Sequence, residues 1–158
     1  LDRQLIGWAV ARGYPSWLDA VHLDQRGLDD IAKARARATN GGRIPERHGK
    51  VVAELSFGFW RYLVSQRYHA SLWVPALNRA FPHGPADLRE RRRGVAGHLP
   101  RPRLVRNRAA HHEPIHRRDL LADLRSAVQL TAWVHPQAGT WVSAQSTLDR
   151  EVDKRAAL

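Results

Sequence analysis

Histidine and arginine are the residues of this sequence whose spacing points most directly to chemistry. Four of the nine histidines gather in one stretch of the chain, at His98, His111, His112 and His116. A neutral imidazole accepts a proton near pH 7, and it is also the commonest metal ligand. Two overlapping motifs in this stretch therefore have to be weighed, one that would bind a metal and one that would not.

The first motif matches the H-E-x-x-H pattern of zinc peptidases and runs from His112 to His116, with Glu113 in second place. That chemistry needs both histidines one turn apart on a continuous helix, with the glutamate activating a zinc-bound water. Pro114 opposes such a helix, because it lacks a backbone N–H and clashes with the preceding turn. No further glutamate precedes Glu151 to complete the ligands. We therefore expect neither a metal nor another cofactor.

The second motif is an arginine followed five residues later by a histidine. It occurs three times, at 43–48, 93–98 and 106–111, where composition alone predicts about one occurrence. Pro45 lies inside the first, and two glycines interrupt the second. The third lies on a predicted helix that ends at His111 or His112, and Asn107 follows its arginine. Context, not spacing, therefore selects the third.

Positive charge is concentrated around this motif. The chain has a formal net charge of +11, and 23 of its 26 basic residues are arginine. The window from Arg89 to Arg118 holds ten arginines and two glutamates, and so carries +8 of that total. Arginine binds phosphate oxygens in bidentate fashion, and a localised basic stripe is typical of nucleic-acid binding. The candidate contacts to nucleic acid are Arg92, Arg93, Arg103, Arg108, Arg117 and Arg118.

The segment from Arg106 to Ile115, with the pattern Arg-Asn-x-x-x-His-His-Glu-Pro-Ile, resembles the signature of Abi-like (abortive infection) proteins of the HEPN superfamily. The apolar segment 51–63, followed by Leu72-Trp73, resembles the core helix of the same group. The likeness covers roughly residues 18–141. It implies an all-α bundle with a four-helix core and extra short helices. It also implies a homodimer that pairs two Arg/His sets in one cleft.

The resemblance further implies a metal-independent endoribonuclease. In that reading His111 takes the proton of a ribose 2′-OH and Arg106 binds the scissile phosphate. Asn107 orients either the phosphate or the imidazole, and His112 and Glu113 support the site. The product would be a 2′,3′-cyclic phosphate, and DNA would not be cut. The implied setting is phage defence in the cytoplasm, with RNA as substrate and an antitoxin or regulatory protein as a further partner.

Other readings stay open for several of these residues. His112 is also a candidate cation at a helix C-terminus, and Glu113 is a candidate ion-pair partner of a neighbouring arginine such as Arg117. The basic stripe could serve a non-catalytic module that binds RNA or DNA. A third reading is a protein-interaction domain whose charge only maintains solubility.

Length and composition limit the number of domains and the kinds of site that the chain can have. A chain of 158 residues corresponds to about one domain, so we expect a single HEPN-like domain over 1–158 with an incomplete first helix. Cysteine is absent, which excludes disulfides and thiolate metal sites. No run of 18 apolar residues occurs, so the sequence predicts no membrane span.

The hydrophobic pattern is helical almost throughout, and no segment alternates with the period of a strand. Two expectations matter most for the site. Pro100 and Pro102 should break or kink the helical line, and Gly58 should allow a close helix–helix approach. The predicted helices lie near residues 1–9, 29–38, 50–66, 75–81, 86–99, 103–111 and 119–134, with a loop at 39–47, a stop at Pro136 and a short last helix capped at Ser146–Asp149.

Overall fold

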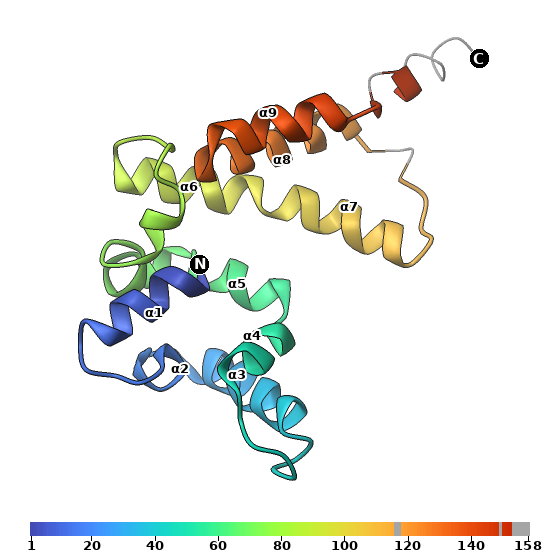
Figure 1. The fold of residues 1–158 in the computed structure, drawn as a ribbon. Coiled ribbons are helices and arrows are strands. Elements are labelled where there is room, and N and C mark those ends of the chain that lie inside the picture. The colour runs from blue at the N-terminus through green and yellow to red at the C-terminus, as the bar shows by residue number, and fades with distance from the viewer. Residues whose placement is uncertain (116–117, 149, 153–158) are drawn as a thin grey trace. The chain divides into compact units, whose positions relative to one another are not determined.

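The computed structural model describes residues 1–115, 118–148 and 150–152 and shows an all-α chain (Figure 1). About 70% of it is helical and no strand occurs among the described residues, so the predicted fold class is confirmed. Within the same residues, no helix is long and apolar enough to cross a membrane. The chain divides into two compact units, Leu1–Ala80 (unit 1) and Phe81–Leu158 (unit 2). A single domain stays a prediction.

Unit 1 is built from short helices joined by capped turns. α3 begins four residues before its predicted start, because the Asp24 carboxylate accepts a hydrogen bond from the Gly27 backbone N–H (3.2 Å) and caps the helix. It ends at Ala38, and Asn40, which has φ +50°, turns the chain into the predicted loop. The elements of unit 1 are α1 (Asp2–Val10), α2 (Trp17–Ala20), α3 (Gln25–Ala38), α4 (His48–Glu54), α5 (Phe57–Leu63), η1 (Gln66–Tyr68), η2 (His69–Trp73) and η3 (Leu77–Ala80).

The prediction of one helix over 50–66 is wrong, because α4 and α5 are separate. Leu55 is extended, with ψ 126°, and the Ser56 hydroxyl accepts a hydrogen bond from the Phe59 backbone N–H (3.1 Å). Ser56 therefore starts a new helix. Gly58 does not mark a helix–helix contact either. The nearest atom that a Cβ there would meet is the Ser56 hydroxyl oxygen, 3.3 Å away.

Aromatic side chains fill the core of unit 1. The Trp17 ring stacks on Phe59, with centroids 6.3 Å apart, and lies tilted against Trp60 at 5.8 Å. Trp17 Nε1 donates to the Asp2 carboxylate (2.6 Å), which satisfies its buried polar atom. An apolar stripe is expected on the segment 51–63; four of its residues, Val51, Leu55, Phe59 and Leu63, are buried, and the fifth, Tyr62, is half-buried. Each such side chain contributes about 1.5–3 kcal/mol through burial.

A polar cluster ties α3 to α5 and η1. The Asp24 carboxylate accepts hydrogen bonds from the Tyr62 hydroxyl and the Arg67 guanidinium. The Tyr62 hydrogen bond, assisted by those of Gly27 and Tyr68 and by the Arg67 charge, lowers the pKa of Asp24. The same contact with Asp24 raises the pKa of Tyr62. Unit 1 thus contains one ionised carboxylate that several elements share.

Unit 2 consists of α6 (Leu88–His98), α7 (Pro100–Ala110), α8 (Leu120–Val134) and α9 (Pro136–Gln145). Asp87 caps α6 through the Glu90 N–H (2.6 Å), a bond that lowers the pKa of Asp87, and Asp119 caps α8 through the Ala122 N–H (2.9 Å). The break expected at the prolines is confirmed, because α6 ends at His98 and α7 begins at Pro100. Both prolines occupy the first turn of α7, where a missing N–H leaves no bond unmade.

α9 was not expected. Pro136 does end α8, but it also starts a new helix, because proline suits the first helical position. The two helices lie side by side (Figure 1). A Cβ on Gly139 would lie 2.7 Å from the Ala132 Cβ, so glycine permits this approach. A helical turn follows after Ser146, whose hydroxyl accepts from the Leu148 N–H (3.2 Å); Asp149 lies outside the described residues.

The buried face of α8 differs from the predicted one. Apolar positions were expected to face inward, yet the buried residues of α8 are Asp123, Ser126 and Leu130. The two polar residues are held there by partners on neighbouring segments of unit 2, described below. The predicted inward residues are only half-buried, namely Leu120, Leu124, Ala127, Val128 and Thr131.

Candidate nucleic-acid interface and active site

The end of α7 brings the three predicted catalytic residues together. Arg106 Nη1 donates a hydrogen bond to Asn107 Oδ1 (3.2 Å), and the His111 backbone N–H donates to the Asn107 carbonyl oxygen (3.0 Å). Arg106 and His111 are exposed, and Asn107 is half-buried. An imidazole and a guanidinium at one exposed helix end can both reach a substrate from solution.

The chain turns sharply at His112. This residue has φ +53°, and its N–H donates to the Ala109 carbonyl (3.2 Å), while the Glu113 N–H donates to the Arg108 carbonyl (2.8 Å). These two bonds form the Schellman motif that closes many helices, usually with glycine at the left-handed position. The helix ends where the sequence predicts.

This helix end also bears on the H-E-x-x-H match. Because α7 stops at Ala110, His112 is not on a continuous helix with the residues that follow it. His116 lies outside the described residues. Among the residues that the structure does describe, no three His, Asp or Glu side chains form a group that could hold a metal ion.

Arg108 fastens the loop that follows α7. Its Nη1 donates to the Pro114 carbonyl (3.0 Å), and its Nε lies 3.9 Å from a Glu113 carboxylate oxygen. Arg108 is half-buried and Glu113 is exposed. Glu113 thus pairs with a neighbouring arginine, as expected, and that arginine is Arg108. Arg117, the example considered from the sequence, lies outside the described residues.

Arg118 is held by a buried carboxylate. Its Nε and Nη2 each lie 2.9 Å from an oxygen of Asp123, and Arg101 Nη1 donates to the same carboxylate (3.2 Å). Asp123 is 4% exposed and the Arg118 side chain 20%. The hydrogen bond with Asp123 raises the pKa of Arg118. We conclude that Arg118 clasps α8 to the preceding loop, which leaves it little freedom for a phosphate.

Arg92 lies inside unit 2 instead of on its surface. It is 7% exposed, and this burial, followed by the nearby Arg93 charge, lowers the pKa of its guanidinium. An exposed Arg92 was expected from the basic run that it belongs to, so that expectation is corrected. Arg93 is exposed and Arg103 half-buried, and neither forms an ion pair among the described residues.

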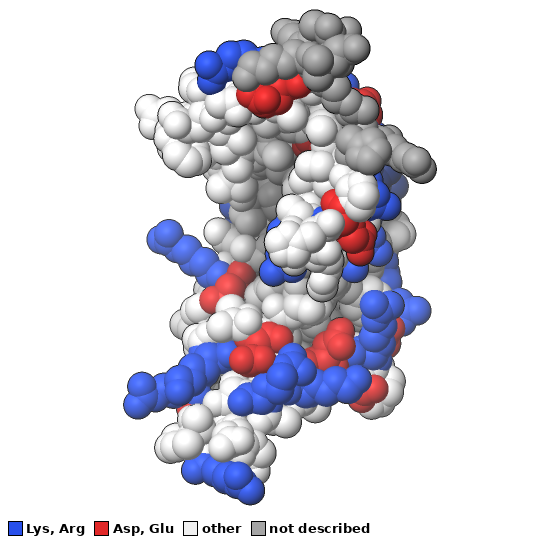
Figure 2. Space-filling model, turned by 90° about the vertical axis from the view of Figure 1, so that its right-hand side faces the viewer, with Lys and Arg blue, Asp and Glu red and all other residues white. Residues whose placement is uncertain are grey.

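Burial of Arg92 and the ion pairs of Arg108 and Arg118 leave fewer free cations in the stripe than the sequence suggests. Figure 2 shows one face of the molecule, on which Lys and Arg side chains lie next to Asp and Glu. Of the arginines predicted to contact nucleic acid, Arg93 and Arg103 are accessible and form no ion pair within the described residues.

An apolar pocket lies beside Arg106. It has a volume of about 340 Å³ and is formed between α7 and α8, with Val105, Leu124 and Ile115 among its lining residues. Half-buried apolar positions of α8, which the sequence assigned to a core, line this pocket. A guanidinium next to an apolar recess can bind a ligand that has both a charged and an aromatic part.

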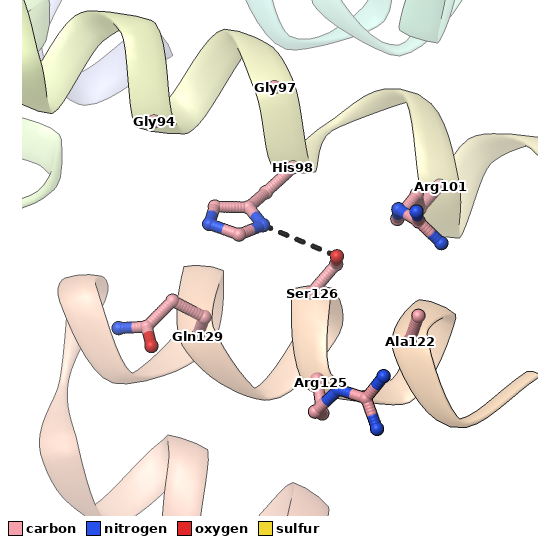
Figure 3. A pocket seen from close by; sticks show the side chains of 8 residues that line it. All are labelled: Gly94, Gly97, His98, Arg101, Ala122, Arg125, Ser126 and Gln129. Atoms are coloured by element: carbon pink, nitrogen blue, oxygen red, sulfur yellow. Dashed lines mark hydrogen bonds between the residues drawn. The ribbon is translucent and has the colours of Figure 1, made fainter.

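A second recess lies between α6 and α8, and the sequence did not single it out. We call it the α6–α8 groove; it has a volume of about 570 Å³ (Figure 3). Its polar lining comes from His98, Arg101, Arg125, Ser126 and Gln129. The spacing of 125, 126 and 129 on one helix face could have indicated it, had α8 not been interpreted from its apolar residues alone.

Comparison of the chain with protein-family models, with curated proteins and with solved structures gave no match. The likeness to Abi-like proteins therefore stays a resemblance in sequence pattern. The structure places Arg106, Asn107 and His111 at one helix end and adds Arg101 and Arg125 in a groove. It buries Arg92 and ties the partly exposed Arg118 to Asp123.

Proposed function

We propose that this protein is a metal-independent endoribonuclease. The observation that carries the proposal is the exposed cluster of Arg106, Asn107 and His111 at the end of α7. In the proposed reaction His111 takes the proton of a ribose 2′-OH. The 2′ oxygen then attacks the adjacent phosphorus, the bond to the 5′ oxygen breaks, and this oxygen takes a proton from water. The products are a 2′,3′-cyclic phosphate and a 5′-hydroxyl.

Arg106 stabilises the charge that develops on the phosphate oxygens during this attack. Its hydrogen bond to Asn107 Oδ1 fixes one side of the guanidinium and leaves further N–H groups for a phosphate. Electrostatic groups of this kind are worth about 10²–10³ in rate, and a general base about 10²–10⁴. The apolar pocket beside Arg106 offers a place for a nucleobase next to the scissile phosphate.

The resemblance to Abi-like proteins of the HEPN superfamily extends the proposal. It adds a homodimer in which two Arg/His sets share a cleft, a role in abortive infection in the cytoplasm, and an antitoxin or regulatory partner. The exposure of the α7 end supports the dimer, because a second copy could approach it without displacing a buried side chain of that helix.

The proposal is tested by cleavage of a labelled single-stranded RNA in EDTA, with analysis of the product ends. The wild type should yield cyclic-phosphate ends. His111→Ala should lose about 10²–10⁴-fold in rate, and Arg106→Ala about 10²–10³-fold. His22→Ala, which removes an exposed histidine of unit 1, is the matched control and should cleave normally. Cleavage that EDTA abolishes, or that survives in His111→Ala, contradicts the proposal.

A second candidate is a non-catalytic module that binds RNA or DNA. The absence of an ion pair to Arg93 and Arg103 within the described residues favours it, because such cations are available to phosphates. This module would bind nucleic acid with a steep salt dependence, and binding would survive His111→Ala. Binding without any cleavage would identify it.

A further inference from the structure

Two arginines bring positive charge to the α6–α8 groove, and a histidine lies beside them. Arg101 enters it from the first turn of α7 and Arg125 from α8, and their side chains are 44% and 69% exposed. His98 enters from α6. No Asp or Glu belongs to the lining. Arg101 contacts the buried Asp123 through Nη1 alone (3.2 Å), and Arg125 lies 3.9 Å from the exposed Asp119, so both guanidiniums keep further N–H groups for a ligand.

Hydrogen-bonding groups accompany the charge. His98 Nδ1 and the Ser126 hydroxyl oxygen lie 3.2 Å apart, which holds the imidazole between α6 and α8 (Figure 3). The Trp133 ring packs edge-on against the same imidazole, with centroids 5.6 Å apart. When Ser126 donates the hydrogen bond, His98 Nε2 carries the ring hydrogen and is itself a donor. Gln129 adds an amide to the lining.

α6 has two glycines beside the groove, and they have different roles. A Cβ on Gly94 would lie 2.4 Å from the Trp133 ring, so this glycine lets α6 and α8 approach. Gly97 is different, because a Cβ there would meet nothing within 4 Å. Packing does not require a glycine at this position, although glycine weakens a helix by about 1 kcal/mol relative to alanine. An absent side chain at Gly97 keeps the groove open.

We propose that the α6–α8 groove binds the phosphodiester backbone of a single-stranded nucleic acid, with Arg101 and Arg125 on a phosphate and His98 and Gln129 as hydrogen-bond partners. Paired arginines with further donors suit a phosphate oxygen cluster. A strand of alternating phosphates fits an open groove better than it fits a closed pocket.

This inference rests on the proposed function, because it supplies the substrate strand with a second anchor. Arg101 and His111 lie at opposite ends of α7 and are ten residues apart, which is about 15 Å along a helix. A strand held in the groove could extend from there along α7 to the proposed catalytic residues. The groove would then determine how tightly RNA binds and leave the chemical step to Arg106, Asn107 and His111.

Binding can be measured apart from cleavage with a fluorescent ten-nucleotide RNA that carries 2′-O-methyl groups, and with DNA of the same sequence. Gly97→Glu places a carboxylate in the groove and should weaken binding about tenfold. Gly97→Gln has the same size without the charge and should weaken it less. The matched control is Gly7→Glu on α1, a second exposed helical glycine with open space around it and the same change in net charge.

Arg125→Ala gives an independent measurement. It should lower the slope of log affinity against log salt by about one, and Arg61→Ala, an exposed arginine of unit 1, should change affinity less. Circular dichroism of each variant verifies the helical content. If Gly97→Glu lowers the affinity of the protein for one of the two probes, RNA or DNA, that nucleic acid is the one that the groove binds.

Equal affinities of Gly97→Glu and Gly7→Glu overturn the inference, as does a wild type that binds neither strand. The two proposals fail separately. Groove variants that lose binding support the groove even if no cleavage is ever seen. Loss of cleavage in His111→Ala supports the nuclease even if the groove variants bind normally.

Discussion

The two units of this chain are stabilised by different kinds of interaction. Among the described residues, nineteen of the twenty-two buried hydrophobic side chains belong to unit 1, and unit 2 contributes Phe81, Val95 and Leu130. The three buried polar or charged residues, Arg92, Asp123 and Ser126, all belong to unit 2. Unit 1 therefore depends on apolar burial, and unit 2 on hydrogen-bonded charge.

This difference matters for function because the residues with chemical potential lie in unit 2. An apolar core gains stability from area and tolerates changes of salt. A buried carboxylate between two arginines is stable only while every partner is present. Unit 2 thus exposes cations on elements that ion pairs and small-residue contacts hold together, and the predictions below test how far this contrast goes.

The largest effect is expected in the aromatic core of unit 1. Phe59→Ala removes a ring that is 1% exposed and should lower the free energy of unfolding by about 3–5 kcal/mol. Phe57→Ala is the control on the same helix, since Phe57 is 44% exposed, and it should cost less than about 1 kcal/mol. Urea denaturation measures both. Equal losses would mean that burial does not distinguish the two rings.

A smaller effect is expected from the buried carboxylate of unit 2. Asp123→Ala leaves Arg101 and Arg118 without their shared partner and should cost about 2 kcal/mol, which is less than for a fully buried pair because both arginines are partly exposed. Glu113→Ala, whose ion pair spans 3.9 Å at the surface, should cost less than about 0.5 kcal/mol. A loss in Asp123→Ala as small as in Glu113→Ala would remove the contrast between the units.

The smallest effect concerns two helix ends built alike. Asn40 closes α3 in unit 1 and His112 closes α7 in unit 2, both with positive φ. Asparagine tolerates this conformation better than histidine does. His112→Gly should therefore stabilise the protein by about 1 kcal/mol, and Asn40→Gly by less, as measured by urea denaturation. If His112→Gly instead destabilises the protein, its side chain makes a contact that outweighs the strain.

Capping residues and prolines made much of the fold predictable. The helices predicted at 86–99 and 119–134 correspond to α6 and α8, which Asp87 and Asp119 cap, and Pro100 and Pro102 marked the break between α6 and α7. The errors came from residue types that occur inside or after a helix but can also begin one. Ser56 was treated as part of an apolar stripe although serine also starts helices, and Pro136 as a stop although proline also begins them.

The candidate site was predictable to the extent that it is local. Arg106, Asn107 and His111 belong to one helix end, so their place there follows from the sequence, and a spacing of four puts Asn107 and His111 on one face. The contact between Arg101 and Asp123 and the groove between α6 and α8 join residues more than twenty positions apart, which the sequence does not relate. Their apolar neighbours on α8 pointed to the opposite face as the inward one. A polar residue that is buried with its partners leaves no hydrophobic pattern.

α7 contains no buried residue. A helix of this kind contributes little to the cooperativity of its unit. Its backbone amides should therefore exchange with solvent hydrogens through local openings that cost much less free energy than global unfolding. Any RNA strand or second protomer that binds α7 only in its folded form would add its binding free energy to the stability of the helix. The segment that carries the proposed catalytic residues would then be ordered most firmly when its ligand is bound.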